Sequence, residues 1–401
     1  MARLRLLYLG FAFPPGIHAQ FPDFNTAGHD WETSFSNELR KHLEIRYAGT
    51  MAFPLPPPPA KADPASGIPH DLTLVEEKPR WWMDWKAAQK LKATVLQWEE
   101  DGWVPDALLV YNFTPIYNHF TRWFKKVFPE VPRVLFLLDS AQLGETIPPG
   151  KRLRYRLKPM VVLDETMLDE FTACIGLSRD ARDYFAPRNV PFFWLPGGCT
   201  TPPGPTREFL PPRTGRKLRF GYFGSLSDHA GAWRLAQTFA RSTLDHEFHL
   251  TGPGKNPEKF VELARRDSRI HFHGFLEADN VLPFGRSCDV LVNPRLPGFG
   301  NRNCFPSKLF NYAMCARSII STRLSGVDEV IGPEGFYVGT GDFDRELDRC
   351  LASVAQLDRA ELDRHGRAIY ERIRTGYDWA TQAAGAAQFL EQVVTNTRQA
   401  L

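Results

Sequence analysis

The chain carries a strand-to-helix transition that reads Asp289-Val290-Leu291-Val292-Asn293-Pro294 and, after a loop, Asn303-Cys304-Phe305-Pro306-Ser307-Lys308-Leu309-Phe310-Asn311-Tyr312. The first run is apolar and ends at a proline, as a buried strand does. In the second run Leu309, Phe310 and Tyr312 have the spacing of an inward helix face. Pro306 suits the first turn of that helix, where its missing N–H has no intrahelical partner. The two runs together predict one strand–helix unit of an α/β domain.

Lys308 falls in the first turn of the predicted helix. That end of the helix dipole disfavours a cation. A lysine beside free backbone N–H groups makes sense if an anion such as a phosphate lies between them. A solvated lysine at an ordinary helix start is the alternative, and these residues alone do not decide between the two.

Length and composition limit the class of protein. A chain of 401 residues with 43% apolar and 13% aromatic residues is long enough for two packed domains. The net charge of +3 is too balanced to favour nucleic acid as the main partner. The six cysteines are scattered and predict reduced thiols without a zinc site or disulfide framework. The apolar run from Leu4 to Phe13 is too short to span a bilayer and lacks a cleavage site, so we expect a cytoplasmic protein.

Short apolar runs recur between helix-like segments, which predicts parallel strands covered by helices on both faces. We expect two doubly wound, Rossmann-like α/β domains with the binding site in the cleft between them. The predicted boundaries are residues 1–200, a Pro- and Gly-rich linker at 201–216, and residues 217–379, with a helix over 380–401 packing back on the first domain. The predicted strands are Leu4–Gly10, Ile45–Gly49, Ala107–Tyr111, Val134–Leu138, Cys174–Leu177, Phe192–Leu195, Leu218–Gly224, Phe248–Leu250, Ile270–Phe272, Asp289–Val292 and Ser318–Ser321.

Two stretches have both a structural and a functional interpretation. Trp81, Trp82, Trp85 and Trp98 recur on one helical face, and we interpret this face as core in preference to a membrane or glycan surface. Residues 151–158 form a basic cluster. They could meet anionic lipid at the inner face of a membrane or a phosphorylated acceptor, and a solvated charged face explains them as well.

Glycines follow the strand predicted at Leu218–Gly224. Gly221 and Gly224, with Ser225 beginning the next turn, would let a phosphate approach backbone N–H groups. The full dinucleotide fingerprint is missing, so a nicotinamide cofactor is poorly supported. We interpret Thr251–Gly254 as a plain turn. Candidate acid/base groups at predicted strand ends are His18, His119 and Asp139, each also explained by a structural role.

These residues carry a resemblance. The second half resembles the nucleotide-binding domain of GT-B glycosyltransferases of the large retaining group called family four, or group 1. The resemblance is strongest over residues 218–330 and lies in Phe220–Ser225, His271–Leu276, Cys288–Pro294, Phe305–Tyr312, Ser318–Thr322, Gly326 and Glu329-Val330. The first half resembles the family more weakly, through Gly10–His18, Ser178-Arg179 and Leu195–Gly198. The resemblance implies the GT-B fold and a nucleoside-diphosphate sugar as donor.

The resemblance also implies roles for individual residues. Gly16, Gly224-Ser225 and Ser307-Lys308 would hold the donor and its diphosphate, and Phe275 and Leu276 would lie against the base. The backbone of Cys304, Phe305 and Pro306 would lie beside the donor sugar or the diphosphate. His18 and Asp139, with Asn112 or His119, are candidates for the sugar or acceptor side.

Four positions depart from the family pattern. The family's paired glutamates, which help bind the donor sugar and the ribose, fall on Asn303 and Asn311. Asparagine still hydrogen-bonds to hydroxyls but cannot act as a charged acceptor or a base. Ser225 and Ala230 stand where the family has basic residues, which leaves Lys308 as the best cation for the phosphate, with Arg295 or Arg302 as helpers.

We therefore predict a glycosyltransferase that retains the anomeric configuration and transfers sugar to a glycan, a lipid-linked or a small-molecule acceptor. Retention does not require a protein base, since the leaving phosphate can take the acceptor proton. The sequence has no clustered carboxylates of the kind that bind a catalytic divalent ion, so we expect metal-independent transfer and no cofactor. Asn303, Lys308, His18 and Asp139 are the predicted catalytic residues. The alternatives are a catalytically silent GT-B subunit and a GT-B sugar-nucleotide epimerase.

Overall fold

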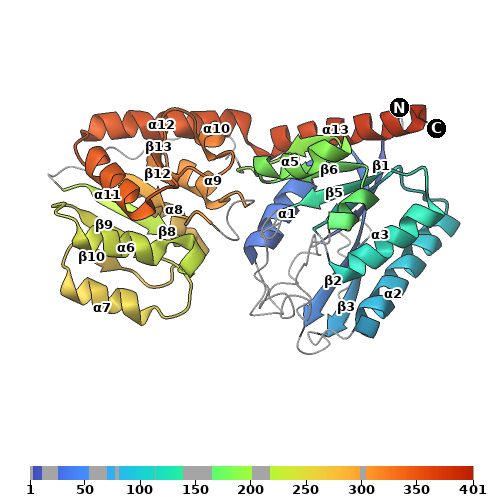
Figure 1. Cartoon of the computed structure of the whole chain (residues 1–401), viewed down its shortest axis with the longest axis horizontal. Helices are drawn as coiled ribbons and strands as arrows, with labels where there is room; N and C mark the ends of the chain where they lie inside the picture. Colours follow the sequence, from blue (N-terminus) through green and yellow to red (C-terminus); the bar gives the residue numbers. More distant parts are fainter. Residues whose placement is uncertain are drawn as a thin grey trace. The chain divides into compact units, whose positions relative to one another are not determined.

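The computed structural model describes residues 3–10, 26–53, 70–76, 81–112, 114–138, 165–200, 217–298 and 304–400. The chain divides into two compact units (Figure 1). Unit 1 comprises Met1–Leu195 and Trp379–Leu401, and unit 2 comprises Pro196–Asp378. The linker expected at 201–216 lies outside the described residues, and the cleft expected between the domains stays a prediction.

Unit 1 is built on a seven-stranded parallel sheet in the order β3-β2-β1-β4-β5-β6-β7. The strands are β1 (Arg5–Leu9), β2 (Glu44–Phe53), β3 (His70–Glu76), β4 (Ala107–Tyr111), β5 (Arg133–Leu137), β6 (Ala173–Gly176) and β7 (Phe192–Trp194). Strand order reverses between β1 and β4, as in a doubly wound Rossmann-like domain. The β3 strand was not predicted, because it follows a proline-rich stretch and alternates polar with apolar residues.

Helices cover both faces of this sheet. On one face α2 (Trp81–Glu100) packs beside α3 (Pro115–Val127), and together they bury Leu91, Phe120 and Phe124 completely (Figure 1). On the other face α1 (Thr26–Leu39) packs against α13 (Trp379–Gln399) through Trp31 and Trp379, whose rings meet edge to face at 4.9 Å. The C-terminal helix is therefore part of unit 1, although a whole domain separates it from α1 in sequence.

The aromatic face expected on α2 is only partly correct. Ala88, Leu91 and Val95 are fully buried, yet 51% of the Trp85 surface is exposed. Trp98 is half-buried and packs against the core, at 5.8 Å from Trp103. The small and aliphatic residues fill the space over the sheet, so the bulkier indole of Trp85 is displaced toward solvent.

Unit 2 repeats the design with a six-stranded parallel sheet in the order β10-β9-β8-β11-β12-β13. The strands are β8 (Arg219–Phe223), β9 (Glu247–Thr251), β10 (Ile270–Phe272), β11 (Val290–Asn293), β12 (Ser318–Thr322) and β13 (Phe336–Val338). The helices are α6 (Ala232–Arg241), α7 (Glu258–Arg266), α8 (Ala278–Arg286), α9 (Lys308–Ala313), α10 (Val327–Ile331), α11 (Phe343–Val354) and α12 (Arg359–Gly376). The α/β class with two Rossmann-like domains is confirmed.

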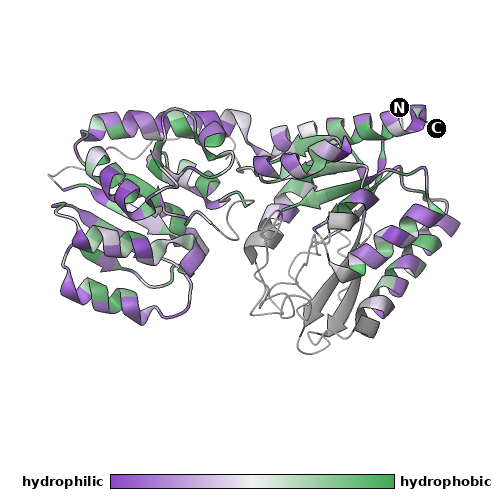
Figure 2. Ribbon diagram, in the orientation of Figure 1, coloured by the Kyte–Doolittle hydropathy of each residue, from purple (hydrophilic) through white to green (hydrophobic). Residues whose placement is uncertain are grey.

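Hydropathy follows the layers in both units. The strands are mainly hydrophobic, and the helices alternate between hydrophobic and hydrophilic residues (Figure 2). In unit 2, Phe220, Phe239, Phe248 and Leu347 belong to one fully buried core on the side of α6 and α11. Among the described helices, none combines the length and the apolar character needed to cross a bilayer.

Candidate functional site

The strand order of unit 2 reverses between β8 and β11. In open α/β sheets, ligands bind beyond the carboxyl ends of the strands at such a switch point. The segments that leave β8 and β11 there are the two that the sequence singled out: the turn at Gly224-Ser225, and the loop that leads to Lys308.

The turn after β8 depends on two glycines. Gly224 has φ +136° and Gly252, in the turn after β9, has φ +151°. A Cβ on Gly252 would lie 1.8 Å from the carbonyl oxygen of Gly224, so only glycine allows the two turns to pack. The Gly224 N–H donates to the Thr251 carbonyl (3.2 Å), and the Leu226 N–H donates to the Pro253 carbonyl (2.8 Å). The Thr251–Gly254 segment is thus more than a plain turn, because its carbonyl groups accept hydrogen bonds from the Gly224 turn and its Gly252 packs against that turn.

The rest of the β8–α6 connection presents hydroxyl groups. The exposed Ser225 accepts a hydrogen bond from the Ser227 N–H at 3.2 Å, and their hydroxyls lie 2.9 Å apart. Gly231 precedes α6 with φ +77°, and a Cβ there would lie 1.8 Å from the Pro294 carbonyl oxygen. This close approach fixes the connection against the end of β11.

Lys308 is the first residue of α9, as expected, and its ammonium reaches back to the end of β8. Its Nζ donates to the Tyr222 hydroxyl at 3.1 Å and lies 4.5 Å from the centre of that ring. A Cβ on Gly224 would be 3.1 Å from the same Nζ, so the ammonium lies directly against the glycine turn. The predicted neighbours Gly224 and Lys308 are therefore brought together.

The charged form of the Lys308 side chain is electrostatically disfavoured at this position. Burial, and secondarily the nearby Arg295, lower the pKa of Lys308 to about 7. Desolvation disfavours a charged amine and a second cation adds repulsion. A bound anion beside Lys308 would offset both effects, because its negative charge favours the charged amine. The site is therefore prepared for a negatively charged ligand.

Two buried tyrosines hold this arrangement, Tyr222 on β8 and Tyr312 on the inward face of α9. The Tyr222 hydroxyl donates to the Ser225 carbonyl, and burial raises its pKa. The Tyr312 hydroxyl accepts from the Phe223 N–H (3.2 Å) and lies within reach of the Phe223 and Val292 carbonyls (3.0 and 3.3 Å). Tyr312 thus ties α9 to the ends of β8 and β11. A tyrosine within an otherwise apolar strand or helix face was the only signal in the sequence.

The segment after β10 contributes an exposed aromatic residue. Phe275 exposes 63% of its surface, which is unusual for a phenylalanine, and Leu276 is half-exposed. The preceding Gly274 carbonyl accepts from the Gly252 N–H at 3.0 Å and from the Thr251 hydroxyl at 2.7 Å. These bonds join the Phe275 segment to the turns that surround Gly224.

The segment that leads into α9 is mostly buried. Cys304, Phe305 and Pro306 are buried, and the Phe305 and Phe310 rings lie 5.6 Å apart. Ser307 and Asn311 are exposed, and the Ser307 side chain forms no cap hydrogen bond. The backbone and Asn311 can therefore face a ligand, while the Cys304–Pro306 side chains anchor the loop.

Several predicted site residues lie outside the described residues: Asn303, Arg302, Gly16, His18, Asp139 and the basic cluster 151–158. Of the first-unit candidates that are described, His119 is exposed on α3. The Asn112 side-chain oxygen accepts from the Leu138 N–H at 2.8 Å, which indicates a structural role at the ends of β4 and β5.

One carboxylate in unit 1 was overlooked in the sequence. Glu32 on α1 is completely buried, and a Cβ on Gly10 would lie 2.3 Å from its Oε1. Glu32 therefore lies beside Gly10 at the carboxyl end of β1, the side of a parallel sheet on which such domains bind ligands. Its signal in the sequence was the helical spacing that places Glu32 on the same face as Phe35 and Leu39.

Comparison with known proteins agrees with this geometry. The family model for glycosyl transferases group 1 matches residues 217–356. Sucrose-phosphate synthase from Thermosynechococcus elongatus is 13% identical with a TM-score of 0.68, covering 98% of this chain and 100% of that one. Anabaena Alr3699/HepE in complex with UDP and glucose is 16% identical with a TM-score of 0.61, covering 97% and 100%. An E. coli trehalose-6-phosphate structure bound with UDP-2-fluoro glucose is 11% identical with a TM-score of 0.65, covering 97% and 99%.

No curated protein matches the sequence. The structural neighbours are similar over nearly the whole chain and indicate its fold, and the family match covers the unit that contains the glycine turns and Lys308. The resemblance predicted from residues 218–330 is confirmed: the model for glycosyl transferases group 1 matches residues 217–356, and the chain has the GT-B fold.

Proposed function

We propose that the protein transfers a sugar from a nucleoside-diphosphate sugar to an acceptor hydroxyl with retention, without a catalytic metal. The observation that carries the proposal is the Lys308 ammonium, which lies against the Gly224 turn with a pKa lowered to about 7. Among the chain's structural neighbours, one is in complex with UDP and glucose and another is bound with UDP-2-fluoro glucose.

In the proposed complex the diphosphate lies between the Gly224-Ser225 backbone and Lys308. Phe275 supplies an exposed aromatic face for the base, and Leu276 lies beside it. Asn311, exposed on α9, hydrogen-bonds the ribose where the family uses a glutamate. An amide makes neutral hydrogen bonds to hydroxyls, which contribute about half as much as charge-assisted bonds.

The proposed reaction breaks the bond between the anomeric carbon and the diphosphate oxygen. The acceptor oxygen forms its bond to that carbon on the same face, and the acceptor proton passes to an oxygen of the leaving diphosphate. Negative charge grows on the diphosphate as the bond breaks, and the Lys308 ammonium stabilises it. Asn303, His18 and Asp139 remain proposed catalytic residues on the sugar and acceptor sides. The proposed acceptor is a glycan or a lipid-linked molecule. Residues 151–158 are proposed to contact an anionic membrane.

A specific observation favours a second candidate. Both positions of the family's paired glutamates hold asparagine, at 303 and 311. A catalytically silent subunit that still binds the sugar nucleotide would tolerate these replacements.

One experiment separates the candidates. The protein is incubated with UDP-, GDP- and dTDP-sugars and with glycan and lipid-linked acceptors, while nucleoside diphosphate release and melting temperature are followed. Transfer requires release that depends on the acceptor, together with a melting-temperature shift for the same donor. A shift without release under any acceptor condition would identify the silent subunit, and an altered sugar without transfer would identify an epimerase.

A further inference from the structure

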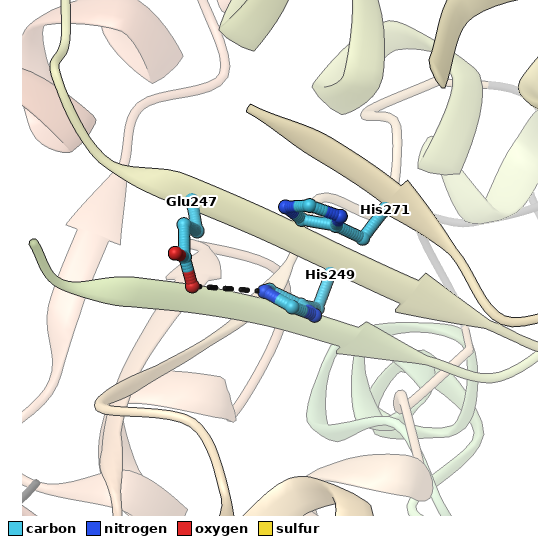
Figure 3. A group of neighbouring side chains, drawn as sticks. All are labelled: Glu247, His249 and His271. Carbon is cyan, nitrogen blue, oxygen red and sulfur yellow. Dashed lines mark hydrogen bonds and ion pairs between the residues drawn. The ribbon is translucent and has the colours of Figure 1, made fainter. Parts of the chain in front are cut away.

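A second cluster of polar side chains lies on the sheet of unit 2, on β9 and the edge strand β10. Glu247 and His249 are two residues apart on β9, and His271 pairs with His249 in the parallel register of β10. Side chains two apart on a strand share a face, and register partners on neighbouring strands do too. The three side chains therefore project from one face, as Figure 3 shows.

The potential ligand atoms are close enough to share one ion. The side-chain nitrogens and carboxylate oxygens of the three residues lie within 4.8 Å of one another. Glu247 Oε2 and His249 Nε2 are 3.2 Å apart, and the His249 and His271 rings stack at 4.4 Å. Ligand atoms around tetrahedral zinc are about 3.4 Å apart, given metal–ligand bonds of about 2.0–2.1 Å. Because the two imidazole rings are stacked, the His271 ring must rotate about its side-chain bonds to direct a nitrogen at the point shared by Glu247 and His249.

A neighbouring histidine supports the orientation of His249. The ring nitrogens His249 Nδ1 and His273 Nε2 lie 2.9 Å apart, and the two rings are 16° from parallel. A metal-bound histidine commonly donates its second N–H to an acceptor, which fixes the tautomer and the ring orientation. His273 can accept that bond and leaves His249 Nε2 directed at Glu247.

Arg219 on β8 is the cation that faces the cluster. Its Nε lies 3.4 Å from Glu247 Oε2, and its guanidinium also lies 3.4 Å from the Ser287 hydroxyl. A metal would compete with Arg219 for one carboxylate oxygen. The carboxylate has a second oxygen, and Arg219 keeps its Ser287 contact, so the competition weakens metal binding without preventing it.

The cluster is accessible from the sheet edge. His249 is buried, with 7% of its surface exposed, while His271 is half-buried. An ion can thus enter at His271, and a water molecule can occupy the remaining coordination position.

We propose that Glu247, His249 and His271 form a Zn²⁺ site with one water as fourth ligand. Two imidazoles and one carboxylate are a donor set that zinc accepts in tetrahedral geometry. The site lies on the sheet face from the start of β9 to the middle of β10, whereas the Gly224 turn lies beyond the carboxyl ends of the strands. Bound zinc joins the edge strand β10 to β9 and braces the segment from His273 to Leu276.

The test uses the full chain after treatment with a chelator and its removal. Zn²⁺ is titrated in competition with a chromogenic chelator, and Co²⁺ serves as a spectroscopic probe of tetrahedral coordination. We expect one Zn²⁺ per chain and visible Co²⁺ bands. His271→Ala and the isosteric Glu247→Gln should each weaken Zn²⁺ binding at least about ten-fold and remove the Co²⁺ bands.

His42→Ala is the matched control, because His42 is an exposed histidine of unit 1. It should leave stoichiometry, affinity and spectrum unchanged. Equal Zn²⁺ affinity in the wild type and both cluster variants would overturn the proposal, as would Co²⁺ bands that persist in them, since either result places the metal elsewhere. No donor sugar or turnover enters the measurement, so its outcome is independent of the proposed transferase reaction.

Discussion

Lys308 should make donor binding depend on pH in a direction that the structure specifies. Its pKa of about 7 in the free protein means that only about 1% of the chains carry a charged Lys308 at pH 9, against about 90% at pH 6. In the proposed complex the diphosphate pairs with the charged form of Lys308. Donor affinity should therefore fall about 100-fold, or about 2.7 kcal/mol, from pH 6 to pH 9.

Removal of the ammonium by Lys308→Ala should abolish this dependence. At pH 6 the variant should bind the donor about 1.5–3 kcal/mol more weakly than the wild type, the size of a charge-assisted contact. At pH 9 the two proteins should bind almost equally, because the wild type must first take up a proton. Lys41→Ala, which removes an exposed lysine of unit 1 paired with Glu38, should behave as wild type at every pH.

Isothermal titration calorimetry provides the measurement. A sugar nucleotide identified in the donor panel is titrated at pH 6, 7, 8 and 9 at constant ionic strength. Repeating the pH 7 titration in buffers of different ionisation enthalpy should reveal uptake of about half a proton per bound donor. A loss of affinity in Lys308→Ala that is the same at pH 6 and pH 9, or the absence of proton uptake by the wild type, would refute the reasoning.

The same pKa affects stability. The pKa of an unfolded lysine is 10.5, so between pH 7 and 10.5 the unfolded chain binds more protons at this residue than the folded chain. The unfolding free energy of the wild type should therefore rise with pH in that window relative to Lys308→Ala. Urea unfolding of both proteins at pH 7 and pH 9 checks the sign.

Three further predictions concern the surroundings of Lys308. Gly252→Ala should lower the unfolding free energy measured with urea by about 2–4 kcal/mol, because its Cβ would lie 1.8 Å from the Gly224 carbonyl oxygen. Gly274→Ala is the control: Gly274 has φ +69° but no atom within 4 Å of the added Cβ, so the loss should be only about 1–2 kcal/mol. Phe275→Ala should leave stability unchanged, because the ring is 63% exposed. It should weaken donor binding by about 1–3 kcal/mol, because the base loses its stacking partner. An unaltered calorimetric affinity would place the base elsewhere. Tyr312→Phe should destabilise the protein by about 1–3 kcal/mol, because the buried Phe223 N–H loses its hydroxyl partner, and equal unfolding midpoints would contradict the role assigned to Tyr312.

Strands with continuous apolar character were predictable from the sequence. Ala107–Tyr111 is observed with the predicted bounds, because a buried parallel strand needs apolar residues on both faces. The edge strands His70–Glu76 and Phe336–Val338 were missed, since one is partly polar and the other is only three residues long. Apolar periodicity carries little information for such short or half-exposed elements.

The site was predictable to the extent that it depends on local sequence. The Gly224 turn and the position of Lys308 at a helix start follow from neighbouring residues. Tyr312 and Glu32 contact elements that are distant in sequence, so each could be seen as a polar residue on a helix face, but its partners could not be predicted. The cluster of Glu247, His249 and His271 required the β9–β10 register, although alternation along each strand was visible in the sequence.

A crystal structure of the protein with its nucleoside-diphosphate sugar tests the central claim most directly. The account predicts diphosphate density beside the Gly224-Ser225 backbone, with a phosphate oxygen within about 3 Å of Lys308 Nζ and the base against Phe275. Diphosphate bound elsewhere, with the Lys308 ammonium still directed only at Tyr222, would contradict it.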